Sequence, residues 1–286
     1  MIIKSGENNN IEELISFSWS HCSSNKTRSF PLFTSKDEIK EKILSRMDDS
    51  NNEILGCYED NKLIGVLLLD VIPNDYYLQT SAFYIEEAND EVGSVFINYI
   101  ENNYPNYSCF IGLTKENQIL TQLLKNNQFE LIDDSLMMEI NIKDIEPKIT
   151  ANKTIKVGYD ELDEYLKFHK EHFESAYWNS VRIKEKFNEW DIFEVKEMDT
   201  IKGGTFIKNY KNNSSEIFGI WSEDSSVYDV LVNGMLAYYK FNKSKVEKII
   251  IMVEISETAL VEVLKENGFK IENTYCCFKK IIKKKD

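Results

Sequence analysis

The first half of the chain alternates between strand-like and helix-like hydrophobic patterns. Two apolar runs, Glu53 to Tyr58 and Leu63 to Val71, flank the polar turn Glu59 to Lys62, which predicts a β-hairpin. Further on, apolar residues recur at the spacing of one helix face, and these are Val92, Val95, Phe96, Tyr99 and Ile100. The other elements predicted for this half are a helix at 11–17, strands at 76–85 and 107–113, a helix at 117–125 and closing strands at 129–142.

The second half repeats this order. A hairpin is predicted from 193–197 and 204–208, and a third strand at 216–221. A helical stripe, a buried strand, a helix and closing strands follow at 227–238, 246–253, 257–266 and 269–282. Short sequences recur as well, since Asn127-Gln128-Phe129 matches Asn267-Gly268-Phe269. Matching landmarks lie about 140 to 150 residues apart, so the repeat is a whole domain.

The repeat predicts an α/β protein of two tandem domains, each a mixed, mostly antiparallel sheet flanked by helices. The segment Asp144 to Asn152, with Pro147 and few apolar residues, is the predicted linker. We therefore expect an N-terminal domain at 1–146 and a C-terminal domain at 152–286.

The composition argues against several classes of protein. The formal net charge is −14, whereas a nucleic-acid binder usually gathers Lys and Arg on one face, so no nucleic-acid partner is expected. No stretch reaches the roughly 18 apolar residues of a membrane span, and the N-terminus lacks a signal-peptide pattern, so no membrane partner is expected. The five cysteines are scattered, and Cys57 and Cys109 stand in apolar runs, which favours reduced thiols. The prediction is a cytoplasmic protein.

The order of elements and the ends of both halves resemble the GNAT superfamily of N-acetyltransferases. In that family an Asn precedes a helix that ends in Leu-Tyr-Glu-Lys-x-Gly-Phe. Here Asn117 lies twelve residues before Phe129, and the second half reads Leu264-Lys265-Glu266-Asn267-Gly268-Phe269. Gly65 and the pair Gly203-Gly204 are similar to the glycine that opens the family's third strand. The resemblance implies two tandem GNAT-like domains and an acyl-CoA-dependent N-acetyltransferase, with acetyl-CoA as the co-substrate.

The resemblance places acetyl-CoA at a loop of the form Gln/Arg-x-x-Gly-x-Gly/Ala, between the fourth strand and the third helix. Glycines there let backbone N–H groups approach the pyrophosphate at a helix N-terminus. The first half reads Ala88-Asn89-Asp90-Glu91-Val92-Gly93 and keeps the last glycine. The second reads Ser222 to Tyr228 without a glycine, although Ser225 and Ser226 could donate to phosphate. For both loops, simple helix capping is the alternative.

We expect the first half to bind the cofactor, because Gly93 survives there and Asn117 matches the family's Asn, whose amide reaches the pantetheine arm. The expected cofactor-binding residues are Ala88, Asn89, Val92, Gly93, Ser94 and Asn117.

Transfer in this family is direct attack of an amine on the thioester. It requires a base for the ammonium proton and an amide N–H on the fourth strand that polarises the carbonyl. Glu86 and Glu87 follow the fourth strand of the first half and are the expected catalytic residues, while Glu216 begins the matching strand of the second. The alternative for each is a solvated surface carboxylate.

The family's acid for the departing thiolate is the Tyr of Leu-Tyr-Glu-Lys, and Leu124 and Leu264 stand in its place. Either Tyr84 or Tyr275 substitutes, or the thiolate leaves without help. This change and the altered loops leave a second hypothesis open, namely a catalytically silent tandem GNAT protein that binds CoA or a protein partner.

The acceptor is expected to be a small-molecule amine or an exposed amino group, of unknown identity. In GNAT domains the first two helices wall the acceptor site, and Tyr177 and Trp178 lie in an aromatic segment after the helix at 162–173. The resemblance implies that both rings line an amine pocket, with core packing as the alternative. His169 and His172 are spaced for one helix face, but zinc needs further ligands, so no metal is expected.

Overall fold

The computed structural model describes residues 1–286 except 48, 50, 87–89, 147–152, 175, 211–212 and 285–286. The chain forms two compact units. Unit 1 comprises Met1–Asp134 and Thr274–Asp286, and unit 2 comprises Ser135–Asn273. We expected domains at 1–146 and 152–286. The two units instead divide at residues 134 and 273, so that 135–146 belong to unit 2 and 274–286 to unit 1.

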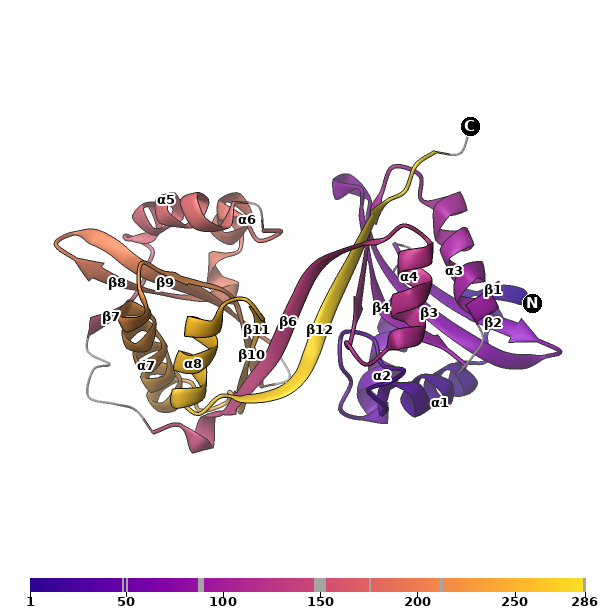
Figure 1. Cartoon of the computed structure of the whole chain (residues 1–286), viewed down its shortest axis with the longest axis horizontal. Helices are drawn as coiled ribbons and strands as arrows, with labels where there is room; N and C mark the ends of the chain where they lie inside the picture. Colours follow the sequence, from indigo (N-terminus) through magenta and orange to yellow (C-terminus); the bar gives the residue numbers. More distant parts are fainter. Residues whose placement is uncertain are drawn as a thin grey trace. The chain divides into compact units, whose positions relative to one another are not determined.

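Unit 1 is a mixed sheet with helices on both faces (Figure 1). Its strands in spatial order are β1 (Ile2–Ser5), β2 (Asn52–Glu59), β3 (Lys62–Ile72), β4 (Tyr77–Ile85), β5 (Ser108–Leu113) and the second half of β12 (Lys270–Ile281). β4 and β5 are parallel, whereas the other neighbours pair antiparallel. Its helices are α1 (Ile11–Cys22), α2 (Lys36–Met47), α3 (Asp90–Asn103) and α4 (Gln118–Asn126).

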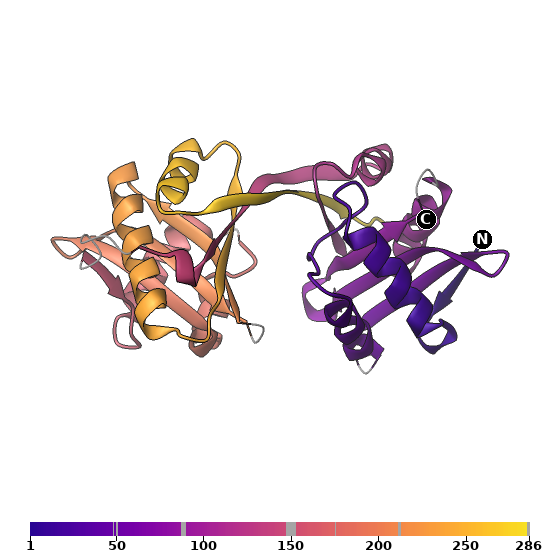
Figure 2. The same ribbon diagram turned by 90° about the horizontal axis from the view of Figure 1, so that it is seen from below.

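Each face of this sheet carries its own hydrophobic core. Leu14 of α1 and Ile39 of α2 are buried on one face, which Figure 2 shows toward the viewer. Helices α3 and α4 cover the other face. Val92, Phe96 and Ile100 of α3 are all fully buried there, so the helix predicted from their spacing is confirmed.

Unit 2 repeats the arrangement. Its strands in spatial order are β6 (Glu130–Asn141) from Ser135 on, β11 (Lys248–Glu254), β10 (Ser214–Ser222), β9 (Thr200–Asn209), β8 (Trp190–Glu197) and β7 (Thr154–Lys156). α5 (Leu162–Phe173) and α6 (Ser180–Glu185) pack on one face, and α7 (Ser225–Asn242) and α8 (Thr258–Glu266) on the other. The mixed, mostly antiparallel sheet flanked by helices is therefore found twice, as predicted.

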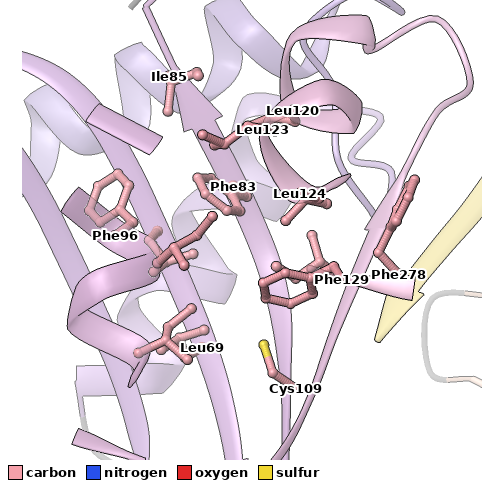
Figure 3. Packing of buried hydrophobic residues seen from close by; sticks show 14 of the residues in the cluster. Leu69, Phe83, Ile85, Phe96, Cys109, Leu120, Leu123, Leu124, Phe129 and Phe278 are labelled. Carbon is pink, nitrogen blue, oxygen red and sulfur yellow. The ribbon is translucent and has the colours of Figure 1, made fainter. Parts of the chain in front are cut away.

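The closing strand of each unit comes from the opposite half of the sequence. In unit 1, the β12 segment Cys276–Ile281 pairs antiparallel with β5, and Phe278 packs in a core cluster with Phe129 (Figure 3). In unit 2, the β6 segment Ser135–Asn141 pairs antiparallel with β11. The sequence division kept each strand with its own half, because an apolar strand pattern does not specify the strand's partner.

Candidate functional site

In unit 1, the parallel strands β4 and β5 pair only at Tyr77–Gln79 and Ser108–Phe110. Both strands continue beyond this point, β4 to Ile85 and β5 to Leu113, without pairing with each other. A backbone N–H that faces such a gap needs another partner, because an unpaired buried donor is costly. The gap is therefore a place where an extended ligand or another chain segment can bind.

A segment of the chain itself fills this gap in unit 1. Ser29 forms a bridge with Leu113 of β5, and the Phe30 N–H donates to the Gly112 carbonyl at 2.9 Å. On the other side, the Phe83 N–H of β4 donates to Ser29 Oγ at 2.9 Å. Ser29 is fully buried, so the segment forms part of the unit's interior.

Two side chains that follow β5 fix this segment. Asn117 Nδ2 donates to the Arg28 carbonyl at 3.1 Å, and Thr114 Oγ1 donates to the Asn25 carbonyl at 2.6 Å. Asn117 Oδ1 accepts from the Leu120 N–H at 3.2 Å and so caps α4. The Asn117 side chain is buried, and it bonds to the start of α4 and to the segment 25–31. These two structural bonds explain why an Asn stands at this position.

Gly93 lies in the first turn of α3 and is buried against α4. A Cβ atom at this position would come within 2.2 Å of Leu123 Cδ2, so the glycine allows the two helices to pack closely. Val92 is fully buried in the same core, and Ser94 Oγ donates to the Asp90 carbonyl at 3.1 Å. Packing within unit 1 therefore explains the surviving glycine.

The expected base Glu86 follows β4 and forms an exposed ion pair with Lys62. Glu87, Ala88 and Asn89 lie outside the described residues. Burial raises the pKa of Tyr84 and the pKa of Tyr275, which makes each phenol a weaker proton donor.

In unit 2, the matching strands β10 and β11 pair at Ser214–Ile217 and Lys248–Ile251 and then part. β10 has a bulge at Phe218, because Ile217 and Gly219 face consecutive residues of β9. The Ser29–Leu113 bridge of unit 1 has no counterpart here in the described part of the chain. Unit 2 thus repeats the gap, and none of its described residues forms a comparable strand segment across it.

Helix α7 begins beyond this gap, and its N-terminal N–H groups are capped by Asp224. Asp224 Oδ1 accepts from the Ser226 N–H at 2.8 Å and from the Val227 N–H at 3.1 Å. The Ser226 hydroxyl, which donates to Oδ1 at 2.6 Å, and these backbone hydrogen bonds lower the pKa of the exposed Asp224 carboxyl. The first turn of α7 has no acidic residue, whereas that of α3 has Asp90 and Glu91. Within the helices themselves the first turn of α7 is thus the less anionic, and its acidic residues, Glu223 and Asp224, stand just before the helix.

On the α5–α6 face of unit 2, three register partners form a row beside the bulge. Trp190 of β8 lies opposite Lys208 of β9, which lies opposite Glu216 of β10. Trp178, one of the two expected acceptor-site residues, packs on this row with its ring centroid 5.1 Å from that of Trp190. Tyr177 lies beside Trp178 and stacks on Arg182.

Glu216 is half-buried in this row, and burial raises the pKa of its carboxyl, although Tyr210 donates to it at 2.7 Å. A carboxylate with a raised pKa is a stronger base, and this one is a single residue away from the paired end of β10. Glu216 is thus better placed for proton transfer than the ion-paired Glu86.

The two histidines of α5 contact aromatic rings. Burial lowers the pKa of His169 to about 4, and its ring lies 4.7 Å from that of Phe206. His172 stacks on Trp221 at 3.7 Å. Within the described residues, no three His, Cys, Asp or Glu side chains gather in a way that could hold a metal ion. No helix there is long and apolar enough to cross a membrane.

Sequence reasoning missed the segment 25–31 and Lys208. The stretch Ser23 to Ser29 is polar, which indicates a surface loop, although Thr27 and Ser29 are buried. Lys208 occurs within a predicted strand, and the period-2 alternation does place it on the same face as Phe206. Only the pairing of three strands brings it next to Trp190 and Glu216.

No family model matches the sequence, and no curated protein matches it. Solved structures do match its fold. A GCN5-related N-acetyltransferase from Sphaerobacter thermophilus is 12% identical with a TM-score of 0.69, and the match covers 99% of this chain and 97% of that one. A tandem GNAT protein from the clavulanic acid biosynthesis pathway is 7% identical with a TM-score of 0.59, over 100% of both chains.

A GNAT-family acetyltransferase from Colwellia psychrerythraea is 13% identical with a TM-score of 0.53, over 98% of this chain and 99% of that one. These matches span the whole chain and confirm the predicted fold class and its resemblance to tandem GNAT proteins. At such identities a shared fold does not fix a reaction, which has to be argued from the site.

Proposed function

Because the whole chain has the tandem GNAT fold, we propose that it transfers an acetyl group from acetyl-CoA to an amine, and that unit 2 carries the reaction. The observation that carries this proposal is the difference between the two strand gaps. Ser29 and Phe30 bond to both strands in unit 1, whereas no comparable segment bridges β10 and β11 among the described residues of unit 2. A bulge lies beside the gap in both units, at Ser81 and at Phe218.

In the proposed reaction, the amine nitrogen forms a bond to the thioester carbon and the bond from that carbon to sulfur breaks. Glu216 takes the proton that the amine loses, and the sulfur leaves as a thiolate that water protonates. Phe218 is the bulged residue and has no register partner on β9, and its N–H is the proposed donor to the thioester oxygen.

No tyrosine is needed as an acid in this scheme. Leu124 and Leu264 are fully buried in their cores, so neither stands at the gap. A thiol has a pKa of about 8.5, so its thiolate is a moderately good leaving group near neutral pH. The family's tyrosine is therefore dispensable here.

Unit 1 is proposed to be catalytically silent. The second hypothesis, that of a silent GNAT protein, would then apply to this half of the chain alone. The proposed domains are accordingly the two compact units with their exchanged closing strands. The cytoplasm is the proposed compartment, supported by five buried, unpaired cysteines.

The test is calorimetric titration with acetyl-CoA of the wild type and of two serine-to-aspartate variants, one in each unit. Ser226→Asp adds a carboxylate at the second residue of α7. Ser94→Asp adds one at the fifth residue of α3. A like charge about 4 Å from the pyrophosphate costs about 1 to 4 kcal/mol, so Ser226→Asp should weaken binding at least about fivefold.

Ser94→Asp should leave the affinity unchanged. Weakening by Ser94→Asp alone would move the cofactor to unit 1. No acetyl-CoA binding by the wild type at millimolar concentration would reject the transferase.

A further inference from the structure

The row beside the gap of unit 2 already holds an ammonium group. Lys208 Nζ lies 4.0 Å from the ring centroid of Trp178 and 5.5 Å from that of Trp190. Its partner carboxylate is Glu189, with Oε2 at 3.4 Å. Cations bind the faces of Trp rings through the ring quadrupole, and the attraction grows where water is excluded. The Lys208 side chain is only 17% exposed, so this site is largely shielded from solvent.

Phe218 of β10 borders the site on the side of the strand gap. Phe218, the bulged residue, is 37% exposed and contacts both Trp178 and Trp190. Glu216, the proposed base, is the register partner of Lys208. A ligand at this site would therefore lie near the proposed base and the proposed thioester position.

We propose that the acceptor is an unbranched primary alkylamine, and that its ammonium group takes the position over the Trp178 ring, next to Trp190, that Lys208 Nζ holds in its absence. This inference rests on the proposed function for the role of the amine, but the cation site itself does not.

The chemistry of Lys208 indicates the class of ligand. A lysine side chain is a compact ammonium group on a straight four-carbon stem, and such a stem packs along apolar rings while the charge is held at its end. Lys186 Nζ lies 5.5 Å from the centroid of the same Trp178 ring, so a second ammonium group is near this face. The carboxylates of Glu189 and Glu216 disfavour an anionic ligand.

Lys208 is able to give up the position. Glu189 is 48% exposed, so the Lys208 ammonium group can stay paired with it while moving toward solvent. The acceptor and Lys208 then compete for one site, and removal of Lys208 should strengthen amine binding.

The test measures binding of n-butylammonium chloride without acetyl-CoA, by Trp fluorescence and by the shift in melting temperature. Lys208→Met keeps an unbranched side chain without the charge and should bind butylammonium at least tenfold more tightly than the wild type. n-Butanol, of similar shape and no charge, should not bind. Lys202→Met, which removes a lysine paired with Glu223 elsewhere in unit 2, should behave as the wild type.

Adding Trp178→Leu to Lys208→Met should abolish the gain. An unchanged affinity of Lys208→Met, or equal binding of butanol, overturns the inference, provided the variant keeps the melting temperature of a folded protein. If Lys208→Met loses the fold, the same competition is tested by Lys208→Arg, which should weaken butylammonium binding or leave it as in the wild type. Tighter binding by that variant overturns the inference. Butylammonium binding without acetyl-CoA binding would reject only the proposed transferase.

Discussion

Units 1 and 2 have the same order of elements, yet their strand gaps differ. In unit 1 the Phe83 N–H of β4 is bonded to Ser29, and the Gly112 carbonyl of β5 is bonded to Phe30. In unit 2 no described segment bridges the gap, which opens beside Glu216, Lys208 and Trp178. Repetition of a fold therefore does not imply repetition of a site, because a short loop outside the repeated elements decides what the gap can bind.

The largest expected effects test the exchange of closing strands. Phe278→Ala should destabilise the chain by about 3 to 5 kcal/mol, because it leaves a cavity in the unit 1 core. Met138→Ala should cost about 2 to 5 kcal/mol in unit 2. Hydrogen exchange locates each loss: the first variant should deprotect β5 and the second β11. Deprotection of β11 by Phe278→Ala and of β5 by Met138→Ala would contradict the exchange and place each closing strand with its own half of the sequence.

The next effect concerns the base. Glu216→Gln should lower the rate of acetyl transfer about hundredfold, because an amide cannot take the proton. Glu86→Gln removes only one side of an exposed ion pair and should leave the rate unchanged. The measurement is thiol release from acetyl-CoA in the presence of an alkylamine. A loss confined to Glu86→Gln would return catalysis to unit 1.

A third substitution removes a hydrogen bond between β4 and the segment 25–31 that fills the strand gap of unit 1. Ser29→Ala leaves the buried Phe83 N–H without its acceptor and should cost about 1 to 3 kcal/mol of unfolding free energy. Because unit 1 is proposed to bind no cofactor, the acetyl-CoA affinity should stay the same. Chemical denaturation and calorimetry measure the two quantities. Ser23→Ala, at an exposed position of the same connection, is the control for stability.

The smallest expected effect compares the two helix starts. Asp224→Asn keeps a side chain that caps α7 and removes its charge, so acetyl-CoA should bind about threefold to fivefold more tightly. Asp90→Asn in the first turn of α3 should have no effect. Titration at low ionic strength is the most sensitive arrangement, since salt screens exposed charges. A gain from Asp90→Asn instead would assign the pyrophosphate to α3.

Much of the fold could be predicted because its signals are local. The stripe Val92, Phe96, Ile100 has the period of a helix buried on one face, and both predicted hairpins form. The turn at Asp60-Asn61 has positive φ at both residues, as a two-residue hairpin requires, and Asn and Asp tolerate that conformation. The tandem repeat itself is visible in the sequence.

The candidate site was predicted only in part. Trp178 and Glu216 were both recognised as candidates. Gly93 and Asn117 led us to expect the cofactor in the first half, whereas our proposal places it in unit 2, because the packing roles of these two residues are invisible in the sequence. Gly93 is explained by the nearby Leu123, and Asn117 by a carbonyl at Arg28. Both partners lie outside the local sequence of the residues that they explain.

The sequence by itself determined the elements, their order and their duplication, because these depend on the periodicity of neighbouring side chains. The tertiary structure alone decided which strand closes each unit, which gap is filled and which side chains surround Lys208. Those outcomes depend on hydrogen bonds and contacts between segments far apart in the chain, such as Ser29 with Phe83 and Phe278 with Ile111. Several strands offer nearly the same apolar pattern, so the choice among partners is made by the packing and pairing of the whole unit.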